Sequence, residues 1–230
     1  MPTLKIRTAV SWLLAPLLLI STLPAWGADK GKDEETIEKA TAVLETMLDS
    51  KVVPADLLVT ANCIVVLPGV KKFAVGVGGS GGRGPMTCRK GKNFTGGEWS
   101  APAMYTIGGA SAGLQLGGSS TDLILLIMAP SAVNKVVEGK IKVGTDLTAA
   151  AGPSGATSTG LVGGADILIY GRVKGLFAGM SLNGASLEPD SSADQRLYGK
   201  GVSAYEIVID NAAKATPAGQ SLVSLLERRS

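Results

Sequence analysis

CIVVLPGVKKFAVGVGGSG, residues Cys63–Gly81, is the stretch that decides the fold, and DILIYGRVKGLFAGMSLNG, residues Asp166–Gly184, repeats its pattern. Shifted by 103 residues, the two align without a gap and are identical at five positions. Each copy predicts a strand, a turn at 68–72 or 171–175, a second strand and a glycine bend. The pair indicates either a pseudo-two-fold repeat of hairpins or two unrelated hairpins with the same turn chemistry.

Glycine is concentrated around these stretches, since 26 of the 31 glycines lie between Gly69 and Gly184. Apolar runs of strand length separate them, so the segment is not of low complexity. Glycine inside strands favours bulges, bends and close backbone approach. We therefore predict an α+β fold: a strongly curved, mostly antiparallel, glycine-rich β body with a pseudo-two-fold hairpin repeat, flanked by helices at both ends.

Helix signals stand on either side of this β body. Asp33 is a candidate cap for a helix over 33–50, whose apolar residues recur every three or four positions. Pro54–Ala61 and Ser131–Val137 predict two shorter helices. Thr216-Pro217 opens a C-terminal helix, because a capping residue precedes proline at the first helical position. Its apolar face would pack on the body.

The first 27 residues have the pattern of a secretory signal peptide. Lys5 and Arg7 precede an apolar run from Ala9 to Ile20, and small residues stand near a cut before Ala28. A membrane anchor is the alternative, but the run is short and contains a proline. We expect a signal peptide at 1–27, a single domain over 28–230, and an exported protein, periplasmic or secreted, that lies peripheral to a membrane.

Composition excludes several classes of function. The chain has no histidine, which removes Ser-His-Asp and Cys-His catalysis and histidine metal ligands, and we predict no enzyme, no cofactor and no metal. Without Lys5 and Arg7, 20 basic and 19 acidic residues remain, so we do not expect nucleic acid as a partner. Because we predict no enzyme, we expect no small-molecule substrate either. The two cysteines, Cys63 and Cys88, are either a disulfide or two buried thiols.

Three motifs are fortuitous or weak. Gly76–Gly81 fits the dinucleotide pattern G-x-G-x-x-G, but Gly82–Pro85 cannot begin the helix that this motif requires. Gly78–Gly82 fits G-x-S-x-G, yet no histidine is present to take the serine proton. Asp190, Ser191 and Asp194 offer oxygens to calcium, but the spacing differs from an EF-hand loop and favours a solvated loop.

Basic residues gather at the two expected hairpin tips. Lys71 and Lys72 lie in one, Arg172 and Lys174 lie in the other, and no acid stands between Gly69 and Lys92. Such a surface beside exposed glycine backbone suits phosphate or lipid headgroups, at about 1 kcal/mol per cation near an anionic membrane. Ordinary solvated turn lysines are the alternative. Arg83 and Trp99 complete the candidate lipid-binding set, and Trp99 is either a membrane-interface anchor or a core residue.

An ordered series of short stretches resembles the SYLF lipid-binding domain, also known as a yeast-type actin-binding domain. Trp99–Ala103 and Gly113–Gly117 carry the resemblance, and it extends over roughly Glu35 to Ala213. Further matching stretches are Val53-Pro54, Ala61, Pro68, Ala151–Pro153, Gly175–Gly179 and Tyr198-Gly199. The helix at 33–50 departs from the family because its polar face is acidic, and Asp194 stands where the family pattern has Asn.

The resemblance implies binding of anionic phospholipid, or of phosphoinositide-like headgroups, and a fit with the bacterial secreted branch of the family. Some members bind actin, which we do not expect of an exported protein. We predict an exported, non-enzymatic lipid-binding protein that captures anionic lipid at its basic hairpin tips. The alternatives are a structural or assembly protein of the cell envelope without a lipid ligand, and an enzyme that uses Asp, Lys or Tyr alone.

Overall fold

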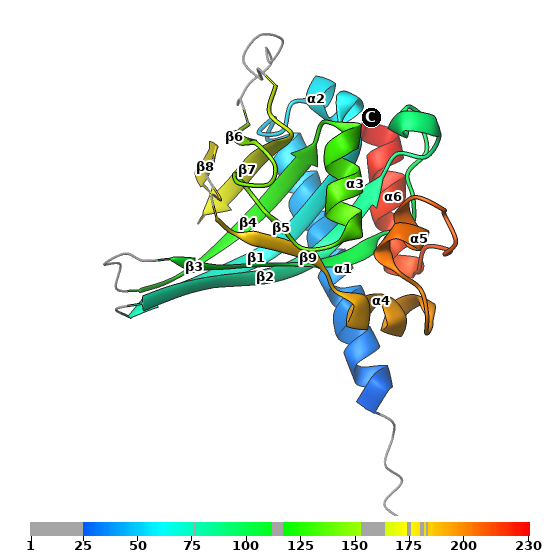
Figure 1. The fold of residues 1–230 in the computed structure, drawn as a ribbon, viewed down its shortest axis with the longest axis horizontal. Coiled ribbons are helices and arrows are strands. Elements are labelled where there is room, and N and C mark those ends of the chain that lie inside the picture. Colours follow the sequence, from blue (N-terminus) through cyan, green and yellow to red (C-terminus); the bar gives the residue numbers. More distant parts are fainter. Residues whose placement is uncertain are drawn as a thin grey trace, which may run out of the picture.

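A strongly curled sheet forms the centre of the molecule in the computed structural model, which describes residues 25–75, 77–111, 117–152, 164–173, 176–179, 182 and 184–230 (Figure 1). In these residues nine strands form one sheet, in the order β5-β9-β3-β2-β1-β4-β7-β6, with β8 also paired to β7. All pairings are antiparallel except that of β6 with β7. The strands are β1 (Cys63–Val75), β2 (Val77–Cys88), β3 (Ala103–Ser111), β4 (Gly117–Ile127), β5 (Ile141–Lys142), β6 (Ala149–Ala151), β7 (Ile167–Val173), β8 (Leu176–Gly179) and β9 (Ser186–Pro189).

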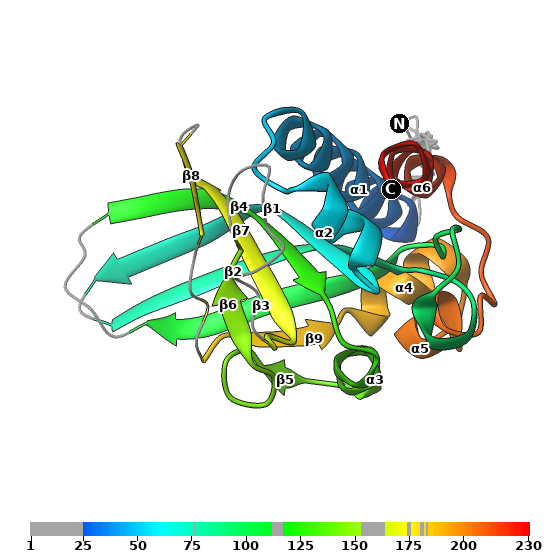
Figure 2. The ribbon, with the colours of Figure 1, turned by 90° about the horizontal axis from the view of Figure 1, so that it is seen from above.

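Helices cover both faces of the sheet near one end, which confirms the predicted α+β fold (Figure 2). They are α1 (Ala25–Asp49), α2 (Ala55–Thr60), α3 (Pro130–Glu138), α4 (Ser191–Tyr198), α5 (Ala204–Val208) and α6 (Pro217–Arg229), with a 3-10 turn η1 (Lys92–Phe94). The helices predicted at 54–61, 131–137 and from Thr216 are therefore confirmed. Thr216 caps α6 as expected, because its side chain accepts a hydrogen bond from the Gly219 N–H.

Alternation along the strands divides the core into two layers. The even positions of β4, such as Ile124 and Leu126, pack under α1, α2, α4 and α6. The odd positions, such as Leu123 and Leu125, pack under α3 and α5 on the opposite face. We call these the α1 face and the α3 face. The predicted apolar stripe of the leading helix, Ile37 to Leu48, is buried on the α1 face.

The leading helix begins earlier than Asp33, so the prediction that Asp33 caps it is wrong. Helix α1 already runs from Ala25, and Asp33 lies inside it with its side chain 0% exposed. The carboxylate is held instead by two arginines from other elements. Asp33 is therefore neutralised by these two arginines and not by the backbone N–H groups of a helix N-terminus. The signal-peptide interpretation concerns residues 1–27, of which 1–24 lie outside the described residues.

The predicted turn at 68–72 is also wrong, because β1 passes through it as one strand. Val65 pairs with Met86 and Lys71 pairs with Gly81, so β1 contains one extra residue there and forms a bulge. Gly69 takes a positive φ of 61° at the bulge, and its N–H donates to Asp122 Oδ1 at 2.8 Å. The pairing of β1 with β2 continues past the bulge as far as Val75 and Val77. The strands β2 and β4 pair with β1 on its two sides, and a turn at 68–72 would lose the backbone hydrogen bonds that they provide.

The second copy does turn where predicted, since Val173 of β7 pairs with Leu176 of β8. The first strands of the two copies, β1 and β7, therefore pair with β4 on its two sides. The predicted position of the hairpin is correct only for the second copy. The register also differs between them. Ile64, the counterpart of Ile167 in the alignment, lies on the α1 face, whereas Ile167 lies on the α3 face.

Candidate functional site

One end of the sheet extends beyond the helices (Figures 1 and 2). We call it the glycine-rich end: Gly69–Val75, Val77–Gly84, Tyr105–Ser111 and Gly117–Thr121, on four neighbouring strands. These segments contain lysine and arginine but no aspartate or glutamate. Glycine is required at some of these positions, because a Cβ on Gly84 would lie 1.9 Å from the Val66 carbonyl oxygen. The glycine-rich end is therefore a narrow, cationic part of the molecule.

Lys71 is the exposed cation of this surface. It lies on the α1 face, opposite Gly81 on β2 and Ser120 on β4. The structure gives Lys71 no ion pair among the described residues, so its charge is available to an outside anion. Lys72 occupies the next position of β1, and its side chain lies outside the described residues. The two lysines are strand residues and not tip residues.

Arg83 lies on the same face as Lys71 but is neutralised. Its Nη2 contacts Asp33 Oδ1 of α1, and its Nη1 lies 4.0 Å from Asp190 Oδ2. Arg196 of α4 also binds Asp33, with Nε 2.7 Å from Oδ2. The sequence gives no signal for this cluster, because its members come from three elements that are distant along the chain. Arg83 holds α1 against the sheet, which limits its availability to a lipid.

Arg172 is neutralised in a similar way. Its Nε and Nη2 donate to Asp122 Oδ2 at 2.9 and 2.6 Å, and the other oxygen of Asp122 accepts the Gly69 N–H at the bulge. This contact ties β7, β4 and β1 together on the α1 face. Lys174 lies outside the described residues. The structure thus brings Lys71, Arg83 and Arg172 to one face, but two of the three serve carboxylates of the protein itself.

The expected exposed glycine backbone does not form an anion site within the sheet. Gly79, Gly81 and Gly82 lie on β2, which is paired on both sides, with β1 and β3. Ladder hydrogen bonds occupy the backbone N–H groups of such a central strand. The attraction for an anion at this end therefore has to come from the lysine side chains.

Trp99 is a core residue, which is the second of the two alternatives for it. It is 1% exposed, its Nε1 donates to Ser230 Oγ at 3.1 Å, and the Arg89 guanidinium lies 4.5 Å from its ring centroid. Arg89 is itself buried and donates to the carbonyl oxygens of Leu58 and Ala61 at the C-terminus of α2. In this fold Trp99 cannot contact a membrane, because the Arg89 side chain and the end of α6 cover it.

Cys63 and Cys88 form a disulfide in the structure. They stand directly opposite each other on β1 and β2, with their Cα atoms 4.0 Å apart, and both are fully buried. The bridge joins the helix-covered ends of these strands. It therefore anchors the base of the hairpin whose other end is the glycine-rich end.

The segment interpreted as a solvated loop with Asp190, Ser191 and Asp194 is helix α4. Asp190 caps it by accepting the Ala193 N–H at 3.0 Å. Asp194 is fully buried: its Oδ1 accepts the Met104 N–H at 2.7 Å, and its Oδ2 has no hydrogen-bond partner in the described part of the chain. The pKa of Asp194 is raised to about 7, mainly by burial; the hydrogen bond from the Met104 N–H acts to lower it, and the charge of Asp190 makes a smaller contribution that raises it.

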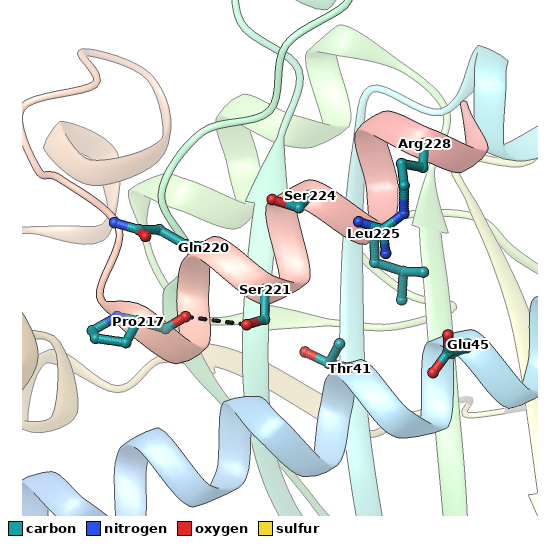
Figure 3. Close-up of a pocket in the computed structure, with 8 residues that line it drawn as sticks. All are labelled: Thr41, Glu45, Pro217, Gln220, Ser221, Ser224, Leu225 and Arg228. Carbon is teal, nitrogen blue, oxygen red and sulfur yellow. Dashed lines mark hydrogen bonds between the residues drawn. The ribbon is translucent and has the colours of Figure 1, made fainter.

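A polar groove of about 480 Å³ lies between α1 and α6 (Figure 3). Glu45 and Arg228 place opposite charges in it, and Thr41, Ser221 and Ser224 add hydroxyl groups. The Ser221 hydroxyl donates to the Pro217 carbonyl oxygen of its own helix at 3.3 Å. The groove contains none of the predicted lipid-binding residues. Among the described residues, no helix combines the length and the apolar character that crossing a membrane requires.

Comparison with known proteins places the chain near a group of eukaryotic proteins. The family model Ysc84, described as "Las17-binding protein actin regulator", matches residues 108–229. "LAS seventeen-binding protein 3" of Saccharomyces cerevisiae is 30% identical over 185 residues, which are 78% of this chain and 39% of that protein. "SH3 domain-containing YSC84-like protein 1" of Homo sapiens is 27% identical over 200 residues, 85% of this chain and 57% of that protein. The chain thus spans about 40–60% of the length of these relatives.

Proposed function

The chain belongs to the Ysc84 family, the family of the SYLF domain, and on that premise we propose that it is a non-enzymatic protein that binds anionic phospholipid at a membrane surface. The observation that carries the proposal is Lys71, an exposed and unpaired cation on a sheet end whose described residues include no acid. Lys72 adds a second cation at the neighbouring position. Phosphate headgroups are the anions that such a surface meets on a membrane.

Electrostatics favours a membrane surface over a single bound anion. Among the described residues on the face of Lys71, the other two predicted cations are not free, because Arg83 binds Asp33 and Arg172 binds Asp122. One lysine contributes about 1 kcal/mol near an anionic membrane, so a tight pocket for one headgroup is not expected here. A surface of many headgroups allows both lysines to act at once without fixed geometry.

We also propose that the protein is exported and belongs to the bacterial secreted branch of the family, which the pattern at 1–27 supports. Sequencing the N-terminus of protein recovered from the host envelope checks export, with Ala28 expected as the first residue. A full-length N-terminus on protein from the cytoplasm would contradict it. The yeast relative is named for binding Las17, and this is a property of that relative that we do not transfer to an exported chain.

Co-sedimentation with vesicles tests lipid binding. We expect pelleting with vesicles of phosphatidylcholine containing phosphatidylglycerol, and little pelleting with phosphatidylcholine alone. Lys71→Glu with Lys72→Glu should weaken binding by more than about 20-fold, because two cations are lost and two acids are added. The matched control is Lys92→Glu with Lys214→Glu, an identical charge change at two exposed positions, in η1 after the Cys88 end of β2 and in the loop before α6, away from the glycine-rich end.

Three results would count against the proposal. Equal pelleting with both kinds of vesicle would remove the anionic preference, and equal weakening by both double variants would show that only net charge matters. No pelleting of the unaltered protein would favour the alternative function, a structural or assembly protein of the cell envelope. Binding should also weaken between low and physiological salt, because charges are screened over about 10 Å at 0.1 M.

A further inference from the structure

We propose that Asp122 is a positioning residue for lipid binding: it closes the bulge of β1 at Gly69, and this bulge places Lys71 on the α1 face. The proposal rests on the proposed function and adds the side chain that sets where its cation lies. Asp122 stands on β4, two positions from Ser120, which is the direct partner of Lys71. It acts through the backbone of β1 and not by contact with a headgroup.

Pro68 requires an irregularity at this point of β1. The strand is central, because β2 and β4 pair with it on its two sides. A proline has no N–H to donate to a neighbouring strand, and prolines inside sheets are found at bulges and edges. The register of β1 against β4 is regular up to Leu67 and regular again from Val70, with one extra residue between them. Gly69 takes the positive φ of 61° at this bulge.

The bulge decides which face of the sheet each later side chain occupies. Side chains of a strand alternate between the two faces, and one extra residue reverses that alternation. Before the bulge, the odd positions Val65 and Leu67 are buried on the α3 face, and after it the even position Val70 is buried there. Lys71 therefore lies on the α1 face, directly opposite Gly81. Continued without a bulge, the register that pairs position 65 with 86 would pair 71 with 80 and turn Lys71 to the α3 face.

Asp122 is placed to hold this bulge. Pro68 and Gly69 together oppose it in the ladder, and its Oδ1 accepts the Gly69 N–H at 2.8 Å. Its Oδ2 accepts hydrogen bonds from Nε and Nη2 of Arg172 at 2.9 and 2.6 Å, which fix the carboxylate from the other side. A bulge leaves a backbone group outside the ladder, and a donor without a partner is unfavourable there. Asp122 supplies the missing acceptor, so it stabilises the register that presents Lys71.

Cross-linking between β1 and β2 tests the hold of Asp122 on the register. Lys71→Cys with Gly81→Cys places two thiols at directly paired positions, and Lys71→Cys with Ser80→Cys places them at the pair expected without the bulge. The chain's own two cysteines are joined in a disulfide, so only the added thiols react. With Asp122 in place, oxidation should link position 71 to 81 and not to 80.

Three substitutions then separate the bulge from its surroundings. Asp122→Ala should slow the 71–81 link about fivefold or more and allow the 71–80 link, since the Gly69 N–H loses its acceptor. Arg172→Gln is the matched comparison and should leave the 71–81 link unchanged, because Oδ1 of Asp122 still accepts that N–H. Gly69→Ala is a milder variant that changes no charge. Its Cβ has room, 3.5 Å from Ser120 Oγ, so only the positive φ is penalised, and the 71–81 link should again be slower.

Vesicle binding tests whether this placement matters for lipid. Two double variants keep the net charge of the unaltered protein: Asp122→Asn with Arg172→Gln retains an oxygen for the Gly69 N–H, and Asp122→Ala with Arg172→Gln does not. With vesicles of phosphatidylcholine and phosphatidylglycerol, adding Lys71→Gln should weaken binding about fivefold in the first background, the contribution of one cation near an anionic membrane. In the second it should weaken binding by less than about twofold, because Lys71 has lost its place on the α1 face. A role in stability alone would lower the melting temperature and leave the contribution of Lys71 unchanged.

The outcomes distinguish this inference from the proposed function. If Asp122→Ala and Gly69→Ala keep the 71–81 link at its full rate, Asp122 does not set the register, and the inference is wrong while the proposed function stands. Equal weakening by Lys71→Gln in the two double variants would also overturn it. If the unaltered protein does not pellet with these vesicles, the proposed function itself is wrong, and the role of Asp122 in lipid binding falls with it. Melting curves show which variants are folded, and where Asp122→Ala is not, Gly69→Ala decides.

Discussion

Asp33 on α1 and Arg196 on α4 form a paired contact across 163 residues of sequence, with Nε 2.7 Å from Oδ2 and Nη2 3.2 Å from Oδ1. Arg83 of β2 reaches the same carboxylate. Asp33 is fully buried, and both arginines retain partial access to solvent. The cluster therefore joins the leading helix, the sheet and α4 around one buried anion.

Removing this anion should destabilise the protein. Asp33→Ala leaves two arginines without their shared partner, and we expect a loss of about 2–3 kcal/mol in the free energy of unfolding, below the 3–5 kcal/mol of a fully buried pair because the arginines are partly solvated. Urea unfolding measures it. Asp49→Ala, which breaks the exposed pair with Arg229, is the control and should cost about 1 kcal/mol or less. Equal losses in the two variants would contradict a special role for Asp33.

Asp194 should make the protein less stable as the pH rises toward neutrality. Its pKa is about 7 when folded and 3.8 ordinarily, so between these values the folded state holds a proton that the unfolded state has lost. The stability that this group contributes is then present at low pH and falls progressively from about pH 4 to pH 7. Below pH 4 and above pH 7 its contribution should be flat.

The variant Asp194→Asn isolates this effect, because it retains an oxygen for the Met104 N–H and has no charge. We expect it to be more stable than the unaltered protein at pH 8, by about 1–3 kcal/mol, and to approach it near pH 4. Thermal melts across this pH range give the comparison, with Asp210→Asn on an exposed turn as the control. Parallel pH curves for the unaltered protein and Asp194→Asn would show that this carboxyl does not titrate in the window.

The disulfide predicts an absence of reactive thiols. Titration of the folded, unreduced protein with Ellman's reagent should find close to zero free thiol, since Cys63 and Cys88 are bonded and buried. Replacing both by alanine should cost about 3 kcal/mol of stability, because the bridge closes a loop of 25 residues in the unfolded chain. Two readily titrated thiols in the unreduced protein would be incompatible with this structure.

Lys71 and Arg172 should respond differently to the same substitution. Lys71→Gln changes an exposed unpaired cation and should lower vesicle binding with little effect on the melting temperature. Arg172→Gln leaves Asp122 without its partner next to the bulge at Gly69, and should lower the melting temperature with a smaller effect on binding. Measuring both quantities on both variants checks the division. A larger binding loss for folded Arg172→Gln would return Arg172 to the lipid-binding set.

Local patterns were sufficient to predict much of the secondary structure. The apolar stripe from Ile37 to Leu48, the Thr216-Pro217 start of α6 and the apolar runs of β1 and β4 depend on neighbours only a few residues away. Glycine density also predicted a curled antiparallel sheet. The acid-free composition between Gly69 and Lys92 was visible in the sequence, and it remains the basis of the candidate site.

The path of β1 through Pro68 and Gly69 depended on tertiary structure. A proline-glycine pair is typical of a turn, but here strands pair on both sides of β1 and the Asp122 carboxylate accepts the Gly69 N–H, so the pair forms a bulge. The pairing of β1 with β2 then continues as far as Val75 and Val77. Whether each basic residue is paired with a carboxylate also depended on the tertiary structure. Arg83 and Arg172 bind carboxylates 50 residues or more away along the chain, whereas Lys71 has no carboxylate partner in the part of the chain that the structure describes.

The sequence by itself therefore determined the fold class, the helices at both ends and a basic, glycine-rich segment. Only the tertiary structure decided which basic residues are free, how far β1 pairs with β2 and that Trp99 and Asp194 are buried. The physical reason is the separation along the chain over which each interaction acts. Helix periodicity and capping act over three or four residues, and the sequence displays them directly. Ion pairing and burial depend on distances in space, which the register of a curled sheet sets between residues far apart in the chain.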